Sequence, residues 1–305
     1  MALPSTAAAA IPATISPVPS PVRAFCAHYA TNTGAVVALG FFLLLVCAAL
    51  FAPWLAPHDP IEQFRNHLLT PPVWTPKGNP LFLLGTDELG RDILSRLIHG
   101  ARVSLAIGLL SVTMSLIPGV LLGLVAAFQP RLVAPAIMRV MDVLMAIPGL
   151  LLAICVITIL GPGLVNTMLA IAFGALPGYT RLARAAALAE IDKEYVIASR
   201  VAGAGTLRLM LRTVLPNCMP PLIVKATLSF SSAVLETAAL GFLGLGVQAP
   251  TPEWGTMLSA ARDYIDRASW VVTMPGLTIL VSVLAINLMG DGLRDALDPK
   301  LKRIA

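Results

Sequence analysis

Long apolar runs alternate along the chain with shorter segments that carry most of its charged residues. Six of these runs approach the roughly 20 apolar residues that a helix needs to cross a bilayer. They extend over residues 34–52, 103–128, 137–160, 164–179, 222–247 and 271–289. Core helices of soluble proteins are rarely so long and so poor in charge. The pattern therefore predicts an all-α membrane protein with six transmembrane helices.

The first 24 residues differ in composition from the rest of the chain. They are rich in Ala, Pro and Ser, and proline neither propagates a helix nor donates a backbone hydrogen bond. We expect residues 1–24 to form a disordered cytoplasmic tail and residues 25–305 to form one membrane domain. A cleaved signal peptide fits poorly, because this segment lacks a charged start and the first apolar run is too long.

The distribution of positive charge indicates how the chain is oriented in the membrane. The chain is 57% hydrophobic and 12% charged, with a formal net charge of +5. Six spans place 14 Lys and Arg residues on one side and 7 on the other. Because Lys and Arg concentrate in cytoplasmic loops, both termini and residues 181–216 are predicted to be cytoplasmic. Topology accounts for the positive charge, and no nucleic-acid partner is expected.

Only two acidic residues lie inside the predicted spans. Asp142 follows Arg139 by three residues, so a local ion pair on one helix face explains it. Glu236 has no local cation and is a candidate for a polar translocation path, with an interhelical hydrogen bond as the alternative. The four His and four Cys residues show no ligand or disulfide spacing. We therefore expect no metal site and no catalytic residue in this chain.

The first external loop has the pattern of an amphipathic helix over residues 86–99. Asp87 with Arg91, and Asp92 with Arg96, form acid-first pairs four residues apart, and apolar residues share the other face. Such a helix would lie on the outer membrane surface and lead into the second span. A docking role for these four charged residues is a further hypothesis.

A charged segment between the fourth and fifth spans contains helix start and stop signals. Asp192 can cap a short helix over residues 193–202, and Gly203 can end it in the left-handed conformation. Thr206 can then start a second helix that leads toward Pro216. The segment predicts a helix-turn-helix along the cytoplasmic membrane face.

This segment resembles the EAA loop of ABC importer permeases, whose pattern is Glu-Ala-Ala, three residues, Gly, nine residues and Ile-x-Leu-Pro. Gly203 sets the register, so Ala198 and Ser199 take the Ala-Ala places and Leu215-Pro216 match. Two positions depart from the pattern: Ile197 and Thr213. The resemblance implies a coupling helix that contacts an ATPase subunit through Glu194, Tyr195, Ala198, Ser199, Arg200 and Gly203.

Further motifs extend the likeness over about residues 25–303. They are Gly85-Thr86-Asp87, Gly90-Arg91-Asp92, the stretch from Ala238 to Gly246, Pro250-x-Pro252-Glu253-Trp254-Gly255 and the stretch from Asn287 to Asp295. With these motifs the chain resembles the C-type permeases of the peptide, opine and nickel ABC importer family, and looks most like those of bacterial dipeptide importers. The resemblance implies a type I ABC importer permease fold.

The same resemblance implies a non-catalytic translocation subunit in the bacterial inner membrane. Its partners would be a homologous B-type permease, two cytoplasmic ATPase subunits that bind ATP and Mg, and a periplasmic or lipid-anchored substrate-binding protein. The chain itself contains no Gly-x4-Gly-Lys phosphate loop. Dipeptides are the expected cargo, with haem, oligopeptides, glutathione or nickel as alternatives. A self-contained secondary transporter or channel is the alternative function, but it leaves the long basic loop unexplained.

Overall fold

The computed structural model describes residues 21–297. Apart from an isolated β-bridge, every regular element in this part of the chain is helical. The first half contains α1 (Pro21–Thr31), α2 (Thr33–Leu50), α3 (Ala52–Leu55), α4 (Ile93–Phe128), α5 (Val133–Met145) and α6 (Gly149–Leu160). The second half contains α7 (Leu164–Ile191), α8 (Glu194–Val201), α9 (Thr206–Arg208), η1 (Leu209–Val214), α10 (Leu215–Phe242), α11 (Trp254–Ala260), η2 (Arg262–Tyr264) and α12 (Ser269–Leu297).

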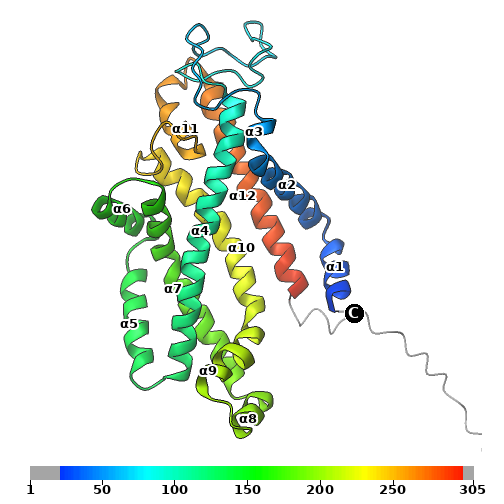
Figure 1. Cartoon of the computed structure of the whole chain (residues 1–305), viewed down its shortest axis with the longest axis vertical. Coiled ribbons are helices and arrows are strands. Elements are labelled where there is room, and N and C mark those ends of the chain that lie inside the picture. The colour runs from blue at the N-terminus through cyan, green and yellow to red at the C-terminus, as the bar shows by residue number, and fades with distance from the viewer. Residues whose placement is uncertain (1–20, 298–305) are drawn as a thin grey trace, which may run out of the picture.

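The long helices α4, α7, α10 and α12 run along the long axis of the molecule, and α2 packs against α4 and α12 (Figure 1). Helices α4 and α7 approach most closely where α4 has glycine. A Cβ at Gly119 would lie 2.6 Å from the Cβ of Tyr179, and one at Gly123 would lie 2.5 Å from the carbonyl oxygen of Thr180. Small residues allow such close packing of helices inside a membrane.

Four helical segments of the described chain are long and apolar enough to cross a membrane. They are Thr33–Leu50, Ile93–Phe128, Thr206–Phe242 and Ser269–Leu297. The predicted span over residues 137–160 is not one straight helix, because α5 and α6 are bent by 92° at a short break. Pro148 explains this break, since proline lacks the backbone donor that a continuing helix needs. The bent pair makes a fifth span if it is counted as one.

The remaining predicted span, residues 164–179, forms the first part of α7, which continues to Ile191. Helix α7 is not among the four segments above. The all-α class is confirmed for residues 21–297, and the count of six spans stays a prediction. Residues 1–20 of the predicted tail lie outside the described residues, whereas α1 begins at Pro21 and makes the last four residues of that tail helical.

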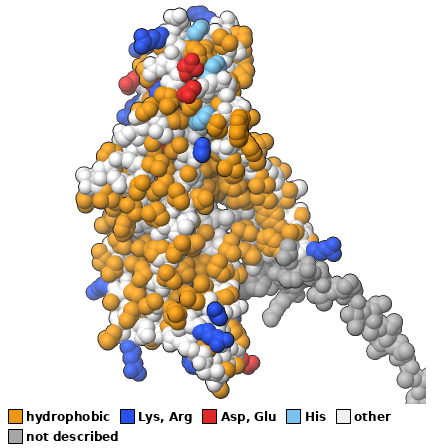
Figure 2. All heavy atoms as spheres, viewed as in Figure 1, with side chains coloured by type: hydrophobic (Ala, Val, Ile, Leu, Met, Phe, Trp, Pro, Cys, Tyr) orange, Lys and Arg blue, Asp and Glu red, His pale blue; other side chains and the backbone are white. Residues whose placement is uncertain are grey.

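The surface has the distribution of side chains expected for a membrane chain. Figure 2 shows a broad belt of hydrophobic side chains around the middle of one face, with charged side chains gathered toward the two ends. Large apolar side chains such as Leu109, Leu280 and Leu284 are more than half exposed. An exposed apolar belt of this extent is typical of a surface that contacts the hydrocarbon core of a bilayer.

The structure corrects the predicted helix over residues 86–99. Helix α4 begins only at Ile93, and the side chain of Asp92 caps it by accepting a hydrogen bond from the backbone N–H of Ser95 at 3.0 Å. Before that cap, Gly85 and Gly90 adopt positive φ angles of 82° and 76°, and Thr86 bridges to Asp92. The chain therefore forms a tight loop, since positive φ interrupts a right-handed helix.

Replacing Gly123 by Leu should separate α4 from α7. The added side chain has no room beside Thr180, and overpacking typically costs about 1–3 kcal/mol. Thermal unfolding of the purified protein in detergent measures the loss. Gly40→Leu in α2 is the matched control, because a Cβ at Gly40 meets nothing within 4 Å. Equal melting temperatures for the two variants would contradict the role given to the α4–α7 contact.

Candidate functional site

The helical hairpin of α8 and α9 projects from one end of the molecule (Figure 1). Gly203 ends α8 with a φ of 86°, as predicted, and its N–H donates to the carbonyl of Arg200 at 3.0 Å. The predicted cap is wrong: Lys193 is the N-cap residue of α8, while Asp192 ends α7. Helix α7 ends at Ile191 with Asp192 as its C-cap, so only Lys193 is left to precede the first residue of α8.

The second helix of the hairpin starts at Thr206, as predicted, but does not stop near Pro216. Helix α9 passes through the π-helical turn η1 directly into α10. Thr206 to Phe242 thus forms one 37-residue helical segment. A π-turn is often found at functional positions within long helices. The hairpin is therefore continuous with a membrane helix.

One apolar side chain attaches α8 to the rest of the protein. Val196 is fully buried and packs in a cluster with Leu209, Met210 and Val214 of η1 and with Ala187 of α7. It is the only buried residue of α8. Because that helix has two turns, a single buried position fixes which face is left open.

The opposite face of α8 is exposed. Val201 is 84% exposed, and Ile197 is 47% exposed. Five of the six residues predicted to contact an ATPase are exposed, and Ser199 is partly buried. Exposed apolar residues beside small ones, such as Ala198 and Gly203, form a flat surface that suits a protein partner. The contact itself stays a prediction.

Glu190 provides a polar attachment that sequence reasoning missed. Its carboxylate accepts hydrogen bonds from Lys193 Nζ at 2.7 Å and from Tyr195 Oη at 2.5 Å. Partial desolvation and the bond to Glu190 raise the pKa of the Tyr195 hydroxyl to about 12. The spacing of Glu190 and Lys193, three residues apart, was the available signal. Together with Val196, these exposed bonds connect α8 to the end of α7.

Glu236 lies on α10, beside a cavity of about 180 Å³. The cavity also contacts Ser111 of α4, Gly149 at the start of α6, Gly174 of α7 and Lys225 of α10. Within residues 21–297, the Glu236 carboxylate makes no hydrogen bond or ion pair, so the interhelical hydrogen bond is not formed. The cationic residue that lines the same cavity is Lys225, which lies three helical turns before Glu236 on α10. A role in a translocation path stays a prediction.

Asp142 pairs across two helices. Arg181 of α7 donates to its carboxylate, and both side chains are about half exposed. The predicted pair with Arg139 is wrong. Residues that lie 39 positions apart meet only because α5 packs against α7, and no local pattern contains that contact.

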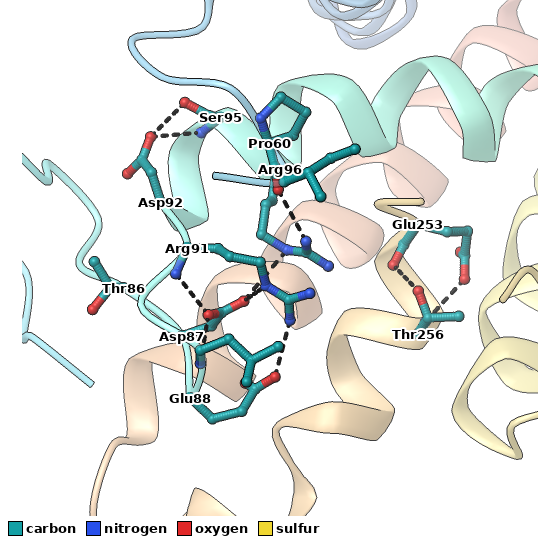
Figure 3. Close-up of polar contacts among 12 residues, drawn as sticks. Pro60, Thr86, Asp87, Glu88, Arg91, Asp92, Ser95, Arg96, Glu253 and Thr256 are labelled. Atoms are coloured by element: carbon teal, nitrogen blue, oxygen red, sulfur yellow. Dashed lines mark hydrogen bonds and ion pairs between the residues drawn. The ribbon is translucent and has the colours of Figure 1, made fainter. Parts of the chain in front are cut away.

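The four charged residues predicted for an outer helix are buried instead, with exposed fractions between 1% and 6%. Figure 3 shows that Asp87 is the centre of this group. Arg91 Nε lies 2.6 Å from its carboxylate, and Arg96 Nε lies 3.5 Å away. The Asp87–Arg91 pair is thus formed, whereas Asp92 caps α4 and does not pair with Arg96. These side chains attach the loop before Ile93 to α4 and do not form an open surface.

Glu253 makes a second buried attachment near the first residues of α4, which sequence reasoning missed. Its Oε1 accepts from the Gly255 N–H at 2.8 Å and from Ser104 Oγ at 3.2 Å. Its Oε2 accepts from the Thr256 N–H at 2.9 Å, and Figure 3 shows Glu253 and Thr256 side by side. Burial raises the pKa of Glu253, and these bonds counter the rise. An acidic residue directly before Trp254-Gly255 was the signal for an N-cap.

Trp254 extends the same attachment into α4. It is fully buried, and its Nε1 donates to the carbonyl of Leu97 at 3.1 Å. Gly100 provides the space, because a Cβ there would lie 2.9 Å from the Trp254 ring. Helix α11 is therefore held on the first turns of α4 by one carboxylate and one indole.

Comparisons with known proteins agree along nearly the whole chain. Residues 119–303 match the family described as binding-protein-dependent transport system inner membrane component. Residues 20–72 match the N-terminal TM domain of oligopeptide transport permease C.

Individual relatives are similar over nearly their full length. The chain is 68% identical over 287 residues to the di/tripeptide transport system permease protein DppC of Pseudomonas aeruginosa, covering 94% of this chain and 95% of that one. It is 56% identical over 289 residues to the dipeptide transport system permease protein DppC of Escherichia coli, covering 94% and 96%. A chain of the MetNI methionine ABC transporter has the same fold, with a TM-score of 0.54 and 22% identity over 67% of this chain and 96% of that chain.

Replacing Glu253 by Ala should destabilise the contact between α11 and α4. The change leaves the buried N–H of Gly255 and the partly buried N–H of Thr256 without an acceptor, at a cost of about 1–3 kcal/mol. Glu253→Gln keeps an acceptor and should cost less. Thermal unfolding in detergent ranks the variants, and Glu62→Ala at an exposed site serves as the control. A Glu253→Ala protein as stable as this control would show that the cap contributes nothing.

Proposed function

This chain belongs to the family of binding-protein-dependent transport system inner membrane components, and we propose that it is the C-type permease of an ATP-driven dipeptide importer. The observation that carries the proposal is the α8 hairpin, which leaves one face of α8 exposed, packs on α7 through Val196 and is continuous with α10. The identity of the cargo rests on the relatives named for di/tripeptide and dipeptide transport.

The orientation follows from charge. We place α2, α4, the bent pair α5–α6, α7, α10 and α12 as six spans, with both termini and the α8 hairpin in the cytoplasm. Arg181, Arg200, Arg208 and Arg212 are then cytoplasmic, in agreement with the positive-inside rule. The external loop and α11 face the periplasm, where a binding protein delivers substrate.

The proposed partners supply what this chain lacks. A B-type permease completes the pathway, and two ATPase subunits bind ATP and Mg and carry out hydrolysis. A periplasmic or lipid-anchored protein binds the peptide before transport. The present chain is not an enzyme in this scheme. Its work is to convert closure of the ATPase subunits into a change of access to the membrane pathway.

The hairpin transmits that movement through two connections. Val196 and the Glu190 hydrogen bonds hold α8 on the end of α7, and η1 joins the hairpin to α10. When an ATPase shifts α8, both helices must follow, because a well-packed contact does not stretch. Helices α7 and α10 also line the cavity beside Glu236. A shift at the cytoplasmic end therefore reaches the interior of the membrane.

Crosslinking tests the contact with the ATPase. In a chain whose four natural cysteines are replaced by Ala, a cysteine at Ala198 should crosslink to an ATPase subunit in the assembled complex. A cysteine at Glu62, at the opposite end of the protein, should not. Absence of crosslinking from Ala198, with efficient crosslinking from another cytoplasmic loop, would refute the assignment of α8 as the coupling helix.

The conformation of Gly203 provides a test of coupling that involves no steric clash. A Cβ at Gly203 or at Gly205 meets nothing within 4 Å, but only Gly203 has positive φ. Gly203→Val should strain the hairpin by on the order of 1–2 kcal/mol and should reduce dipeptide uptake into proteoliposomes per ATP hydrolysed. Gly205→Val should transport like the wild type. Equal transport by both variants would show that the α8 turn is not needed for coupling.

A further inference from the structure

The cavity beside Glu236 contains two opposite charges that attract each other without direct contact. Glu236 and Lys225 are both partly buried, and both line this cavity of about 180 Å³. They lie on one face of α10, about 16 Å apart at their Cα atoms, because eleven residues make three helical turns. Within residues 21–297, neither group forms an ion pair or a side-chain hydrogen bond. Unpaired charges in a membrane protein usually mark a pathway or a ligand.

Lys225 reaches toward α7 at a place where that helix has no side chain. A Cβ at Gly178 would lie 3.9 Å from Lys225 Nζ. One turn earlier, Gly174 lines the cavity, and a Cβ there would lie 3.9 Å from Gly149. The two glycines leave the ammonium group accessible from inside the cavity.

The start of α6 adds positive potential to the same cavity. Gly149 is the first residue of this 12-residue helix, after the break at Pro148, and no side chain caps it. The first N–H groups of a helix carry partial positive charge and seek an acceptor. Broken membrane helices in transporters present such ends to anionic substrate groups. Lys225 and the start of α6 therefore provide the cationic part of the site.

An unsatisfied hydroxyl gives independent evidence for a ligand. Ser111 of α4 lines the cavity, is 1% exposed, and its Oγ has no hydrogen-bond partner. A buried hydroxyl without a partner destabilises the folded state unless something else completes its hydrogen bonding. A polar ligand in the cavity would do so.

We propose that this cavity holds both charged ends of a short zwitterionic peptide during transport, with the α-ammonium at Glu236 and the carboxylate at Lys225 and the start of α6. The inference rests on the proposed function, because it assumes that peptides enter the membrane pathway. It assigns recognition to the two groups that all unmodified peptides share. Peptide side chains can extend past Gly149, where an added Cβ meets nothing within 4 Å.

The spacing of the charges limits the length of the peptide. An extended dipeptide spans about 7 Å and a tripeptide about 10 Å. Because the Glu236 and Lys225 side chains extend beyond their Cα atoms, the gap between the two charged groups is shorter than the roughly 16 Å between those Cα atoms. Longer peptides would leave one charged end outside the cavity, so the site should favour two or three residues.

The test uses the complete importer in proteoliposomes, with radiolabelled Ala-Phe as the probe. Glu236→Gln and Lys225→Met should each lower ATP-dependent uptake about tenfold, as expected for loss of one charge-assisted hydrogen bond. Stimulation of ATP hydrolysis by the binding protein should persist. Leu235→Ala is the matched control, since this neighbouring side chain is 54% exposed and does not line the cavity. Lys225→Arg keeps the charge and should retain uptake.

Peptides with one blocked terminus test which residue binds the peptide ammonium group and which binds the carboxylate. In nanodiscs without the binding protein, titration calorimetry should show that the wild-type complex binds Ala-Phe more tightly than N-acetyl-Ala-Phe or Ala-Phe amide. Glu236→Gln should lose discrimination against the acetylated peptide, and Lys225→Met should lose discrimination against the amide.

Three results would overturn the inference. One is normal uptake by both single variants. Another is that each single variant loses discrimination against the acetylated peptide and against the amide to the same extent. The third is a Glu236→Leu/Lys225→Met double variant that transports normally although neither single variant does, because the two groups would then only neutralise each other. A wild-type complex that imports no dipeptide would instead refute the proposed function.

Discussion

The close packing of α4 against α7 is the contact on which the other helices depend. Gly119 and Gly123 remove the side chains that would separate these two helices. Around this pair, α10 packs on both helices, α2 packs on α4, and α5 and α6 pack on α7. A membrane offers little hydrophobic gain for joining apolar helices, so surface complementarity at such contacts decides the arrangement. The attachments through Asp92 and Glu253 are likewise made to α4.

The two helices that hold the hairpin are also the two that carry most of the cavity. Helix α7 runs from Glu190, at the hairpin, to Gly174, and α10 runs from η1 to Lys225 and Glu236. In the proposed function, movement at α8 reaches both α7 and α10, which together line most of the cavity. The break at Pro148 places the uncapped start of α6 at the same cavity, so a shift of α10 would move Glu236 and Lys225 relative to this helix start.

Features that depend on local sequence could be predicted, and features that depend on packing could not. Apolar runs predict where the long helices lie, and the glycine at position 203 predicts a positive φ there. Both predictions depend only on residues close together in the sequence. The partner of Asp142 was missed because Arg181 comes from another helix. Residues 86–92 have helical spacing of charges, but Asp92 serves better as a cap, and burial of Asp87 with two arginines favours a loop.

The central claim is that α8 and α10 move as one body when nucleotide binds. Arg200 on α8 and Leu235 on α10 are exposed, so both positions can carry spin labels. Pulsed electron paramagnetic resonance can then measure the distance between the two labels in the assembled complex. The account predicts the same distance distribution with and without ATP, while the distance from Leu235 to the partner permease changes. A distance between Arg200 and Leu235 that changes with ATP, at a constant distance from Leu235 to the partner, would contradict it.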